Sequence, residues 1–227
     1  MNFSYDFPKK AAYGKVIPKN KIYAYANSGT GIKELFVREV DKIVWSYKFS
    51  PQTLNLPESD FVKEIQIITI DLKGTDLDYD VLRTIDKAIP SPIIFVLRDN
   101  DKIRYTAAYK RQNEADKSKW VISEYFQSPW MKENKERQPL PVALNLRILY
   151  ETLVKSLISI MPFTNESMEE FVVRVEQIGI KKREAEKIQI KMRKEKQYNR
   201  KVEINAQLRD IRKEIEVLEY GKNKCFK

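Results

Sequence analysis

Residues 62–74, VKEIQIITIDLKG, decide the fold of this chain. The stretch is dominated by isoleucine and threonine, whose β-branched side chains favour an extended strand. Its long apolar run is typical of a strand that is buried on both faces. Because side chains alternate along a regular strand, Asp71 and Lys73 share one face, and Glu64 and Gln66 share the other. The sequence therefore places two pairs of polar residues on a strand that is otherwise apolar.

The segments around this strand predict a mixed sheet flanked by helices. Residues 79–89 have the apolar spacing of a helix that Pro90 ends. Residues 91–99 read as a second buried strand, and two further strands follow at 102–110 and 119–127, the first after a tight turn. We also expect helices over 31–45 and 146–160, and a short strand at 21–26 within an irregular N-terminal arm. The fold class is thus α/β (α+β), with about four or five strands in a domain of residues 1–162.

Residues 163–227 predict a helical C-terminal arm. Ser167 and Glu170 have the spacing of a capping box, and Gly179 is expected to interrupt a first short helix. No proline or glycine occurs between Gly179 and Gly221, which predicts one helix of about 60 Å at 1.5 Å per residue. A heptad pattern at about 200–220 predicts a coiled coil with a partner or a second copy of the chain, through Ile204, Leu208, Ile211, Ile215 and Leu218.

Composition limits the chemistry that the chain can perform. The 227 residues are 42% hydrophobic, which suffices for a buried core. We expect a cytoplasmic protein, since no apolar run is long enough for a membrane span and residues 1–10 lack the core of a signal peptide. The single cysteine, Cys225, excludes an internal disulfide. The absence of histidine excludes His-based zinc sites and Ser-His or Cys-His catalysis, so a metal, if bound, would be an oxygen-liganded ion such as Mg²⁺.

The net charge of +10 favours a polyanionic partner, although basic proteins without nucleic-acid ligands are also common. The charge is densest in the arm. A helix this positive is suited to nucleic-acid phosphates or to an acidic protein, but the exterior of a charged coiled coil has the same pattern. The residues concerned are Lys181, Lys182, Arg183, Lys187, Lys191, Arg193, Lys194, Lys196, Arg200 and Lys201.

Asp71 and Lys73 have the spacing of the second half of a PD-(D/E)xK nuclease motif. In such a site the carboxylate holds Mg²⁺, and the lysine orients the attacking water and offsets charge on the phosphorane. A second metal ligand would have to come from Asp60 or Glu64, and Gln66, next to Glu64 on the same face, is the fifth candidate residue for catalysis. The alternative is that Asp71 and Lys73 are solvated residues at the end of a strand.

Glu64 and Gln66 are expected to have polar partners. Leaving such a group buried and unsatisfied costs about 1–3 kcal/mol. Lys48 and Arg98 are the predicted partners, and a polar groove is the alternative environment. Aromatic residues on the later strands fit either core packing or a stacking platform for bases. These aromatic residues are Tyr105, Tyr109, Trp120, Tyr125, Phe126 and Trp130.

Several segments together resemble the bacterial domain-of-unknown-function family 4391. They are IPKNKIYAY, IVWSYKFSPQTLNL, VKEIQIITIDLKG, LRTIDKAIPSPIIFVL, AAYK and EKQYNRKVEINAQLRDIRKEIEVL. The resemblance implies a genetic context beside superfamily-2 helicases and adenine DNA methyltransferases, in restriction or anti-phage islands. It implies no catalytic residues.

Three functions follow as hypotheses. The first is a non-catalytic accessory subunit that binds a helicase or methyltransferase partner, and nucleic acid, without a cofactor. The second is a divergent Mg²⁺-dependent nuclease. The third is a self-assembling coiled-coil protein that dimerises through its C-terminal helix.

Overall fold

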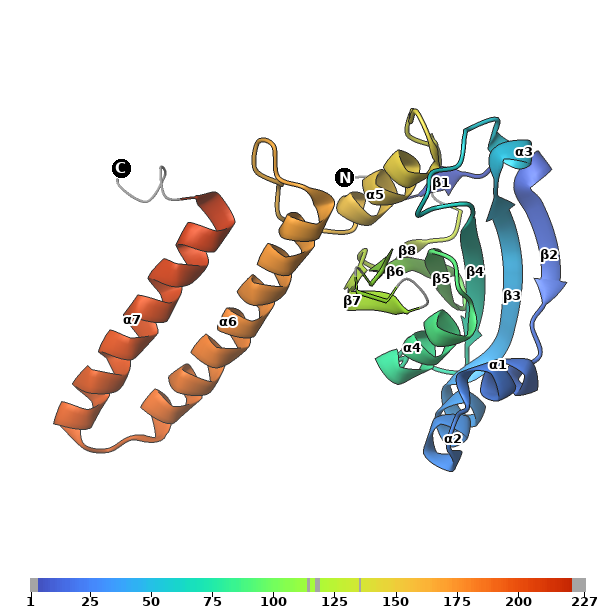
Figure 1. Cartoon of the computed structure of the whole chain (residues 1–227). Helices are drawn as coiled ribbons and strands as arrows, with labels where there is room; N and C mark the ends of the chain where they lie inside the picture. Colours follow the sequence, from blue (N-terminus) through green and yellow to red (C-terminus); the bar gives the residue numbers. More distant parts are fainter. Residues whose placement is uncertain (1–3, 114, 117–118, 135, 222–227) are drawn as a thin grey trace. The chain divides into compact units, whose positions relative to one another are not determined.

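The computed structural model describes residues 4–113, 115–116, 119–134 and 136–221 (Figure 1). The chain divides into two compact units, Met1–Ile158 and Ser159–Lys227, against an expected boundary at residue 162. Cys225 lies outside the described residues. No helix in the described ranges is long and apolar enough to cross a lipid bilayer.

The first unit is an α+β domain whose elements follow one another closely along the chain. In order they are β1 (Tyr5–Asp6), a 3-10 turn (Lys9–Ala11), β2 (Ala12–Val16), α1 (Lys19–Ala26), α2 (Thr30–Glu39), β3 (Val40–Phe49), α3 (Pro51–Leu54), β4 (Ile65–Leu72), α4 (Tyr79–Ala88), β5 (Ile93–Asp99), β6 (Lys102–Gln112), β7 (Trp120–Gln127), β8 (Met131–Lys132), β9 (Gln138–Pro139) and α5 (Leu146–Ser156).

Strand β4 lies inside a mixed sheet with the order β2-β3-β4-β5-β6-β7, and β8 also pairs with β6. It runs parallel to β5, with α4 as the crossover, and antiparallel to β3. The first six residues of β4 are buried, which agrees with the expectation of a strand covered on both faces. The sheet has seven strands in the described part of the chain, so the expectation of four or five was too low.

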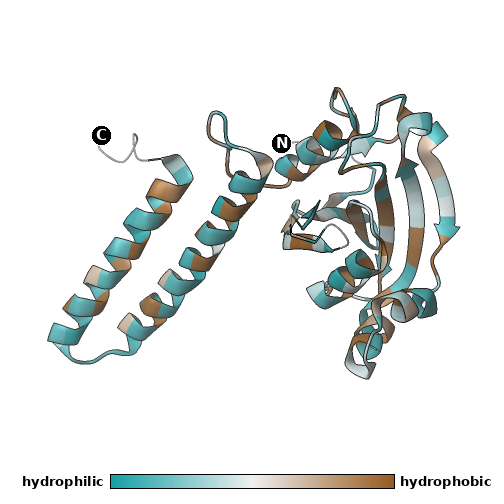
Figure 2. Cartoon of the chain, in the orientation of Figure 1, coloured by the Kyte–Doolittle hydropathy of each residue, from teal (hydrophilic) through white to brown (hydrophobic). Residues whose placement is uncertain are grey.

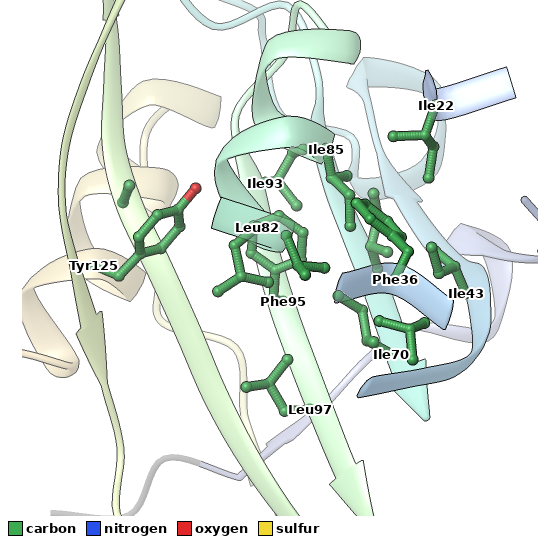
Figure 3. Close-up of a cluster of buried hydrophobic side chains, with 14 residues drawn as sticks. Ile22, Phe36, Ile43, Ile70, Leu82, Ile85, Ile93, Phe95, Leu97 and Tyr125 are labelled. Atoms are coloured by element: carbon green, nitrogen blue, oxygen red, sulfur yellow. The ribbon is translucent and has the colours of Figure 1, made fainter. Parts of the chain in front are cut away.

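Helices α1, α2 and α4 cover one face of the sheet (Figure 3). Helix α4 inserts Leu82 and Ile85 against Ile70 of β4 and Phe95 of β5, and α2 adds Phe36. The opposite face is covered by α5 and the N-terminal segment. Their contacts include a stacked ring pair between Tyr109 of β6 and Tyr150, and edge contacts that Phe7 makes with Tyr47, Phe49 and Tyr105.

Two local predictions near the N-terminus were wrong. Residues 21–26 belong to helix α1, where burial of Ile22 against the core favours a helix over the expected strand. The helix expected over 31–45 ends at Glu39, and Val40 begins strand β3. The apolar residues Val40 and Ile43 satisfy either periodicity, and pairing of β3 with β4 selects the strand.

The second unit is an antiparallel helical hairpin formed by α6 (Met168–Lys194) and α7 (Tyr198–Tyr220). The capping box is confirmed: the Glu170 amide donates to Ser167 Oγ over 3.2 Å, and the Ser167 amide donates to Glu170 Oε2 over 2.9 Å. Gly179 lies inside α6 and does not interrupt it. The single 60 Å helix was therefore a wrong expectation, because the helix ends at Lys194.

The heptad residues explain why the arm folds back. Ile204, Leu208 and Ile211 are buried, as are Phe171 and Ile178 of α6. Folding α7 onto α6 therefore removes the apolar seam from water within one chain. Ile215 and Leu218, at the far end of the seam, are half-buried. The extended coiled-coil arm is replaced in the structure by this intramolecular pair.

Candidate functional site

The five residues considered for catalysis lie near opposite ends of β4. Asp60, Glu64 and Gln66 are at or before its beginning, and Asp71 and Lys73 are at or beyond its end. Asp71 lies seven positions after Glu64 along the strand, a separation of about 23 Å at 3.3 Å per residue. The structure therefore does not bring Asp60 or Glu64 to Asp71 as a second metal ligand.

Lys73 stabilises the C-terminal end of α2. Its Nζ donates to the carbonyl of Val37 over 2.7 Å, and Lys19 Nζ donates to the neighbouring carbonyl of Phe36 over 3.2 Å. Cations at the last carbonyls of a helix satisfy unpaired acceptors and oppose the negative end of the helix dipole. Burial, followed by the nearby charge of Lys73, lowers the pKa of Lys19. This environment gives Lys73 a structural partner.

Asp71 is held by an arginine. Its Oδ1 accepts from Arg98 Nη1 over 3.2 Å, and Arg98 Nη2 lies 3.0 Å from a carboxylate oxygen of Glu133. Arg98 thus pairs with both Asp71 and Glu133, and its positive charge offsets the repulsion between the two carboxylates.

Glu64 and Gln66 form a polar network with β3, as predicted. Glu64 Oε2 lies 2.5 Å from Lys48 Nζ, and its Oε1 accepts from Gln66 Nε2 over 2.7 Å. The Gln66 amide oxygen in turn accepts from Trp45 Nε1 over 2.7 Å. The predicted partner Lys48 is confirmed, whereas Arg98 serves Asp71 instead. Gln66 is fully buried, and the network satisfies its amide.

A cleft of about 340 Å³ brings Asp60 close to Glu64, with Trp120 and Gln112 among the other lining residues. Both oxygens of Glu64 are engaged within the protein, one with Lys48 and the other with Gln66. Across the described residues there is no group of three or more acidic, histidine or cysteine side chains that could hold a metal ion.

Sequence reasoning missed a buried charged cluster between α4 and β6. Lys110 Nζ donates to the carbonyls of Asp86 and Ser91, over 2.5 Å and 3.3 Å, and also to that of Ile89. It lies 3.7 Å from the Asp86 carboxylate, which accepts from the Tyr125 hydroxyl over 2.5 Å. Burial raises the pKa of Asp86 to about 6 and lowers the pKa of Lys110. The available signal was an acid on the apolar face of α4, four residues after Leu82.

The base of the hairpin, where α6 begins and α7 ends, neutralises its cations. Arg174 is buried, with Nε 2.6 Å from Glu166 Oε1 and Nη1 donating to the carbonyl of Leu218 over 2.8 Å. Its guanidinium also lies 3.8 Å from the ring centroid of Phe163. Two predicted nucleic-acid contacts are paired with α7 here: Lys181 with Glu214 over 2.7 Å, and Lys182 with Glu219 over 2.6 Å.

The tip of the hairpin, residues 187–201, presents its cations to solvent. All seven are exposed, and none forms a salt bridge within the described part of the chain. They are Lys187, Lys191, Arg193, Lys194, Lys196, Arg200 and Lys201. Figure 2 shows the loop between α6 and α7 as hydrophilic, in contrast to the alternating colours along the two helices.

Glu195, the single acid of the tip, binds backbone amides of the turn between α6 and α7. Glu195 Oε1 accepts from the amides of Lys196 and Gln197 over 2.8 Å and 2.9 Å. The hydrogen bond from Gln197, ahead of other effects, lowers the pKa of Glu195. These bonds replace helical partners where α6 stops, which explains how the helix breaks without proline or glycine.

One comparison with protein families gives a match that spans nearly the whole chain. The family described as a domain of unknown function, DUF4391, matches residues 5–215. The chain belongs to that family. Curated proteins and solved structures give no match.

The DUF4391 match includes residues 187–201 in full. The basic tip is therefore part of the family domain and not an appended tail. The match also runs through the α/β unit and through most of α7, up to residue 215.

Proposed function

We propose that this DUF4391 protein is a non-catalytic accessory subunit of a cytoplasmic DNA-processing complex, and that its hairpin tip binds the phosphate backbone of nucleic acid. The observation that carries the proposal is the contrast in pairing along the hairpin. Lys181 and Lys182 form salt bridges with α7, whereas none of the seven cations of the tip forms a salt bridge in the described ranges. An exposed cation without a salt bridge can neutralise a phosphate and thereby displace the counterions that are condensed on the nucleic acid.

The arrangement on α6 supports a linear contact. Lys187, Lys191 and Lys194 follow one another at steps of four and three residues, so they lie on one side of the helix. The stripe is about 10 Å long at 1.5 Å per residue. Arg200 and Lys201 add charge from the first turn of α7.

The protein partner proposed from the family resemblance is a helicase or an adenine DNA methyltransferase, in a restriction-like or anti-phage system. We place dimerisation through the heptad residues second, because Leu208 and Ile211 are already buried in the hairpin and would have to be exposed before pairing with another chain.

Salt titration of nucleic-acid binding tests the proposal on the full chain. The affinity of the wild type should fall linearly with salt on logarithmic axes. Replacing Lys187, Lys191 and Lys194 by alanine should reduce the slope by roughly 2 to 3, because each lost phosphate contact removes about 0.7–0.9.

The matched control replaces Lys10, Lys87 and Lys102, exposed lysines of the α/β unit, and should leave the slope unchanged. Equal effects of the two triple variants, or binding that does not respond to salt, would overturn the proposal. Incubation of plasmid DNA with Mg²⁺ or Mn²⁺ should leave the DNA intact. Cleavage that Lys73→Ala abolishes would support the nuclease hypothesis in its place.

A further inference from the structure

Tyr198 is a highly exposed aromatic residue within the basic tip. It is the first residue of α7 and its exposed fraction is 78%. Ile204 begins the buried seam six residues later, so Tyr198 lies about 120° away from that face at 100° per residue. Its ring makes no contact with another aromatic ring or a cation among the described residues. Burial in this chain therefore does not account for the residue.

The neighbours of Tyr198 supply the other half of a nucleotide contact. Lys194, Lys196, Arg200 and Lys201 lie within four residues of it along the chain, and all are exposed. Tyr25 provides the comparison, because it is also 78% exposed but has no charged residue within three positions on either side. An exposed ring among cations is the combination that binds single strands: bases stack on the ring and phosphates meet the cations.

We propose that the hairpin tip binds single-stranded nucleic acid, with an unpaired base stacked on the ring of Tyr198. This inference rests on the proposed function and adds the class of nucleic acid. In a duplex the faces of internal bases are already stacked on one another, so none of them is open to the ring, whereas the phosphates stay open to the cations. The ring therefore strengthens binding of a single strand and contributes little to binding of a duplex.

The strand aromatic residues do not compete for this role. Tyr105, Tyr109 and Tyr125 are buried. Tyr125 donates its hydroxyl to Asp86, and Tyr109 stacks on Tyr150. Their rings support the core. Trp120 and Trp130 are half-buried and already lie against the cations Lys110 and Arg104, and Phe126 is half-buried, so all three are less open to a base than Tyr198.

The experiment compares a fluorescently labelled oligothymidine with a blunt duplex of the same length, by anisotropy on the full chain. Tyr198→Ala should weaken binding of the single strand by roughly 5- to 150-fold, the range expected for one stacked base. Its affinity for the duplex should change less than about twofold, and its salt slope should equal that of the wild type. Tyr198→Phe should bind the single strand like the wild type, because the ring is retained.

Tyr25→Ala is the matched control and should leave both affinities unchanged. The inference is overturned if Tyr198→Ala preserves the affinity for the single strand, or weakens single strand and duplex by the same factor. In either case salt-dependent binding by the wild type would still support the proposed function. Absence of salt-dependent binding to both nucleic acids would instead overturn the proposed function itself.

Discussion

The base and the tip of the α6–α7 hairpin carry positive charge in opposite ways. At the base, Arg174 is buried against Glu166, and Lys182 pairs with Glu219. At the tip, seven cations are exposed and Glu195 is engaged with the turn. The difference arises from α7, whose acids are concentrated in its second half, at Asp210, Glu214, Glu216 and Glu219. A basic stretch that looks uniform in sequence is thus divided by folding into a structural part and an open part.

The largest expected effect separates buried from exposed arginine. Arg174→Met should destabilise the hairpin by about 3–5 kcal/mol, because Glu166 is left as a buried charge without its partner. Arg193→Met, on the same helix but at the tip, should change stability by roughly 0.5 kcal/mol or less. Urea unfolding followed by circular dichroism at 222 nm measures both variants.

The fluorescence of Trp45, Trp120 and Trp130 reports on the α/β unit in the same samples, since the hairpin contains no tryptophan. If the two arginine variants lose the same unfolding free energy, the base does not depend on a buried cation more than the tip does, and the contrast between the two regions is wrong.

The buried charges Lys110 and Asp86 contrast with the exposed cations of the tip, because their burial should make the stability of the α/β unit depend on pH. The pKa of Asp86 rises from 3.8 to about 6 through burial, so between these values the unfolded chain loses a proton that the folded chain keeps. The contribution of Asp86 to the free energy of unfolding is therefore fully present below about pH 4 and is lost as the pH rises towards 6. With two pKa units involved, the loss is on the order of 3 kcal/mol.

Unfolding of wild type and Asp86→Asn, followed by tryptophan fluorescence from pH 4 to 6, tests this expectation. The difference in unfolding free energy between the two proteins should vary with pH in this window, in the direction that the wild type loses stability as pH rises. A constant difference would show that Asp86 titrates normally.

Local signals were sufficient for the elements that carry them. The β-branched run of β4, the apolar face of α4 ended by Pro90, and the capping box of α6 each depend on residues close in sequence. Where one pattern fits two structures, tertiary contacts decide. Pairing with β4 makes Val40–Phe49 a strand, and closure of the apolar seam breaks the long helix at Glu195.

The partners of polar residues could likewise be predicted only where they follow from the neighbouring strand, and not where they depend on tertiary contacts. Pairing of Glu64 with Lys48 could be predicted because an unsatisfied, half-buried carboxylate is costly and a cation on a neighbouring strand removes that cost. The separate fates of Lys182 and Lys191 could not be predicted, since they depend on which residues of α7 return to lie beside them. Lys110 was missed because its partners are mainly backbone carbonyls, which leave no trace in side-chain composition.

The smallest expected effect tests the base directly. Lys182 and Glu219 form an ion pair between partly exposed side chains, so a double-mutant cycle with alanine should give a coupling of about 0.2–1 kcal/mol that declines as salt is added. Because Lys182 is already neutralised by Glu219, Lys182→Ala should change the affinity for nucleic acid less than about twofold, whereas Lys191→Ala should weaken it and lower the salt slope by about 0.7–0.9. If Lys182→Ala weakens binding as much as Lys191→Ala does, the ion pair opens in the complex, and the binding surface extends from the tip along α6 to the base.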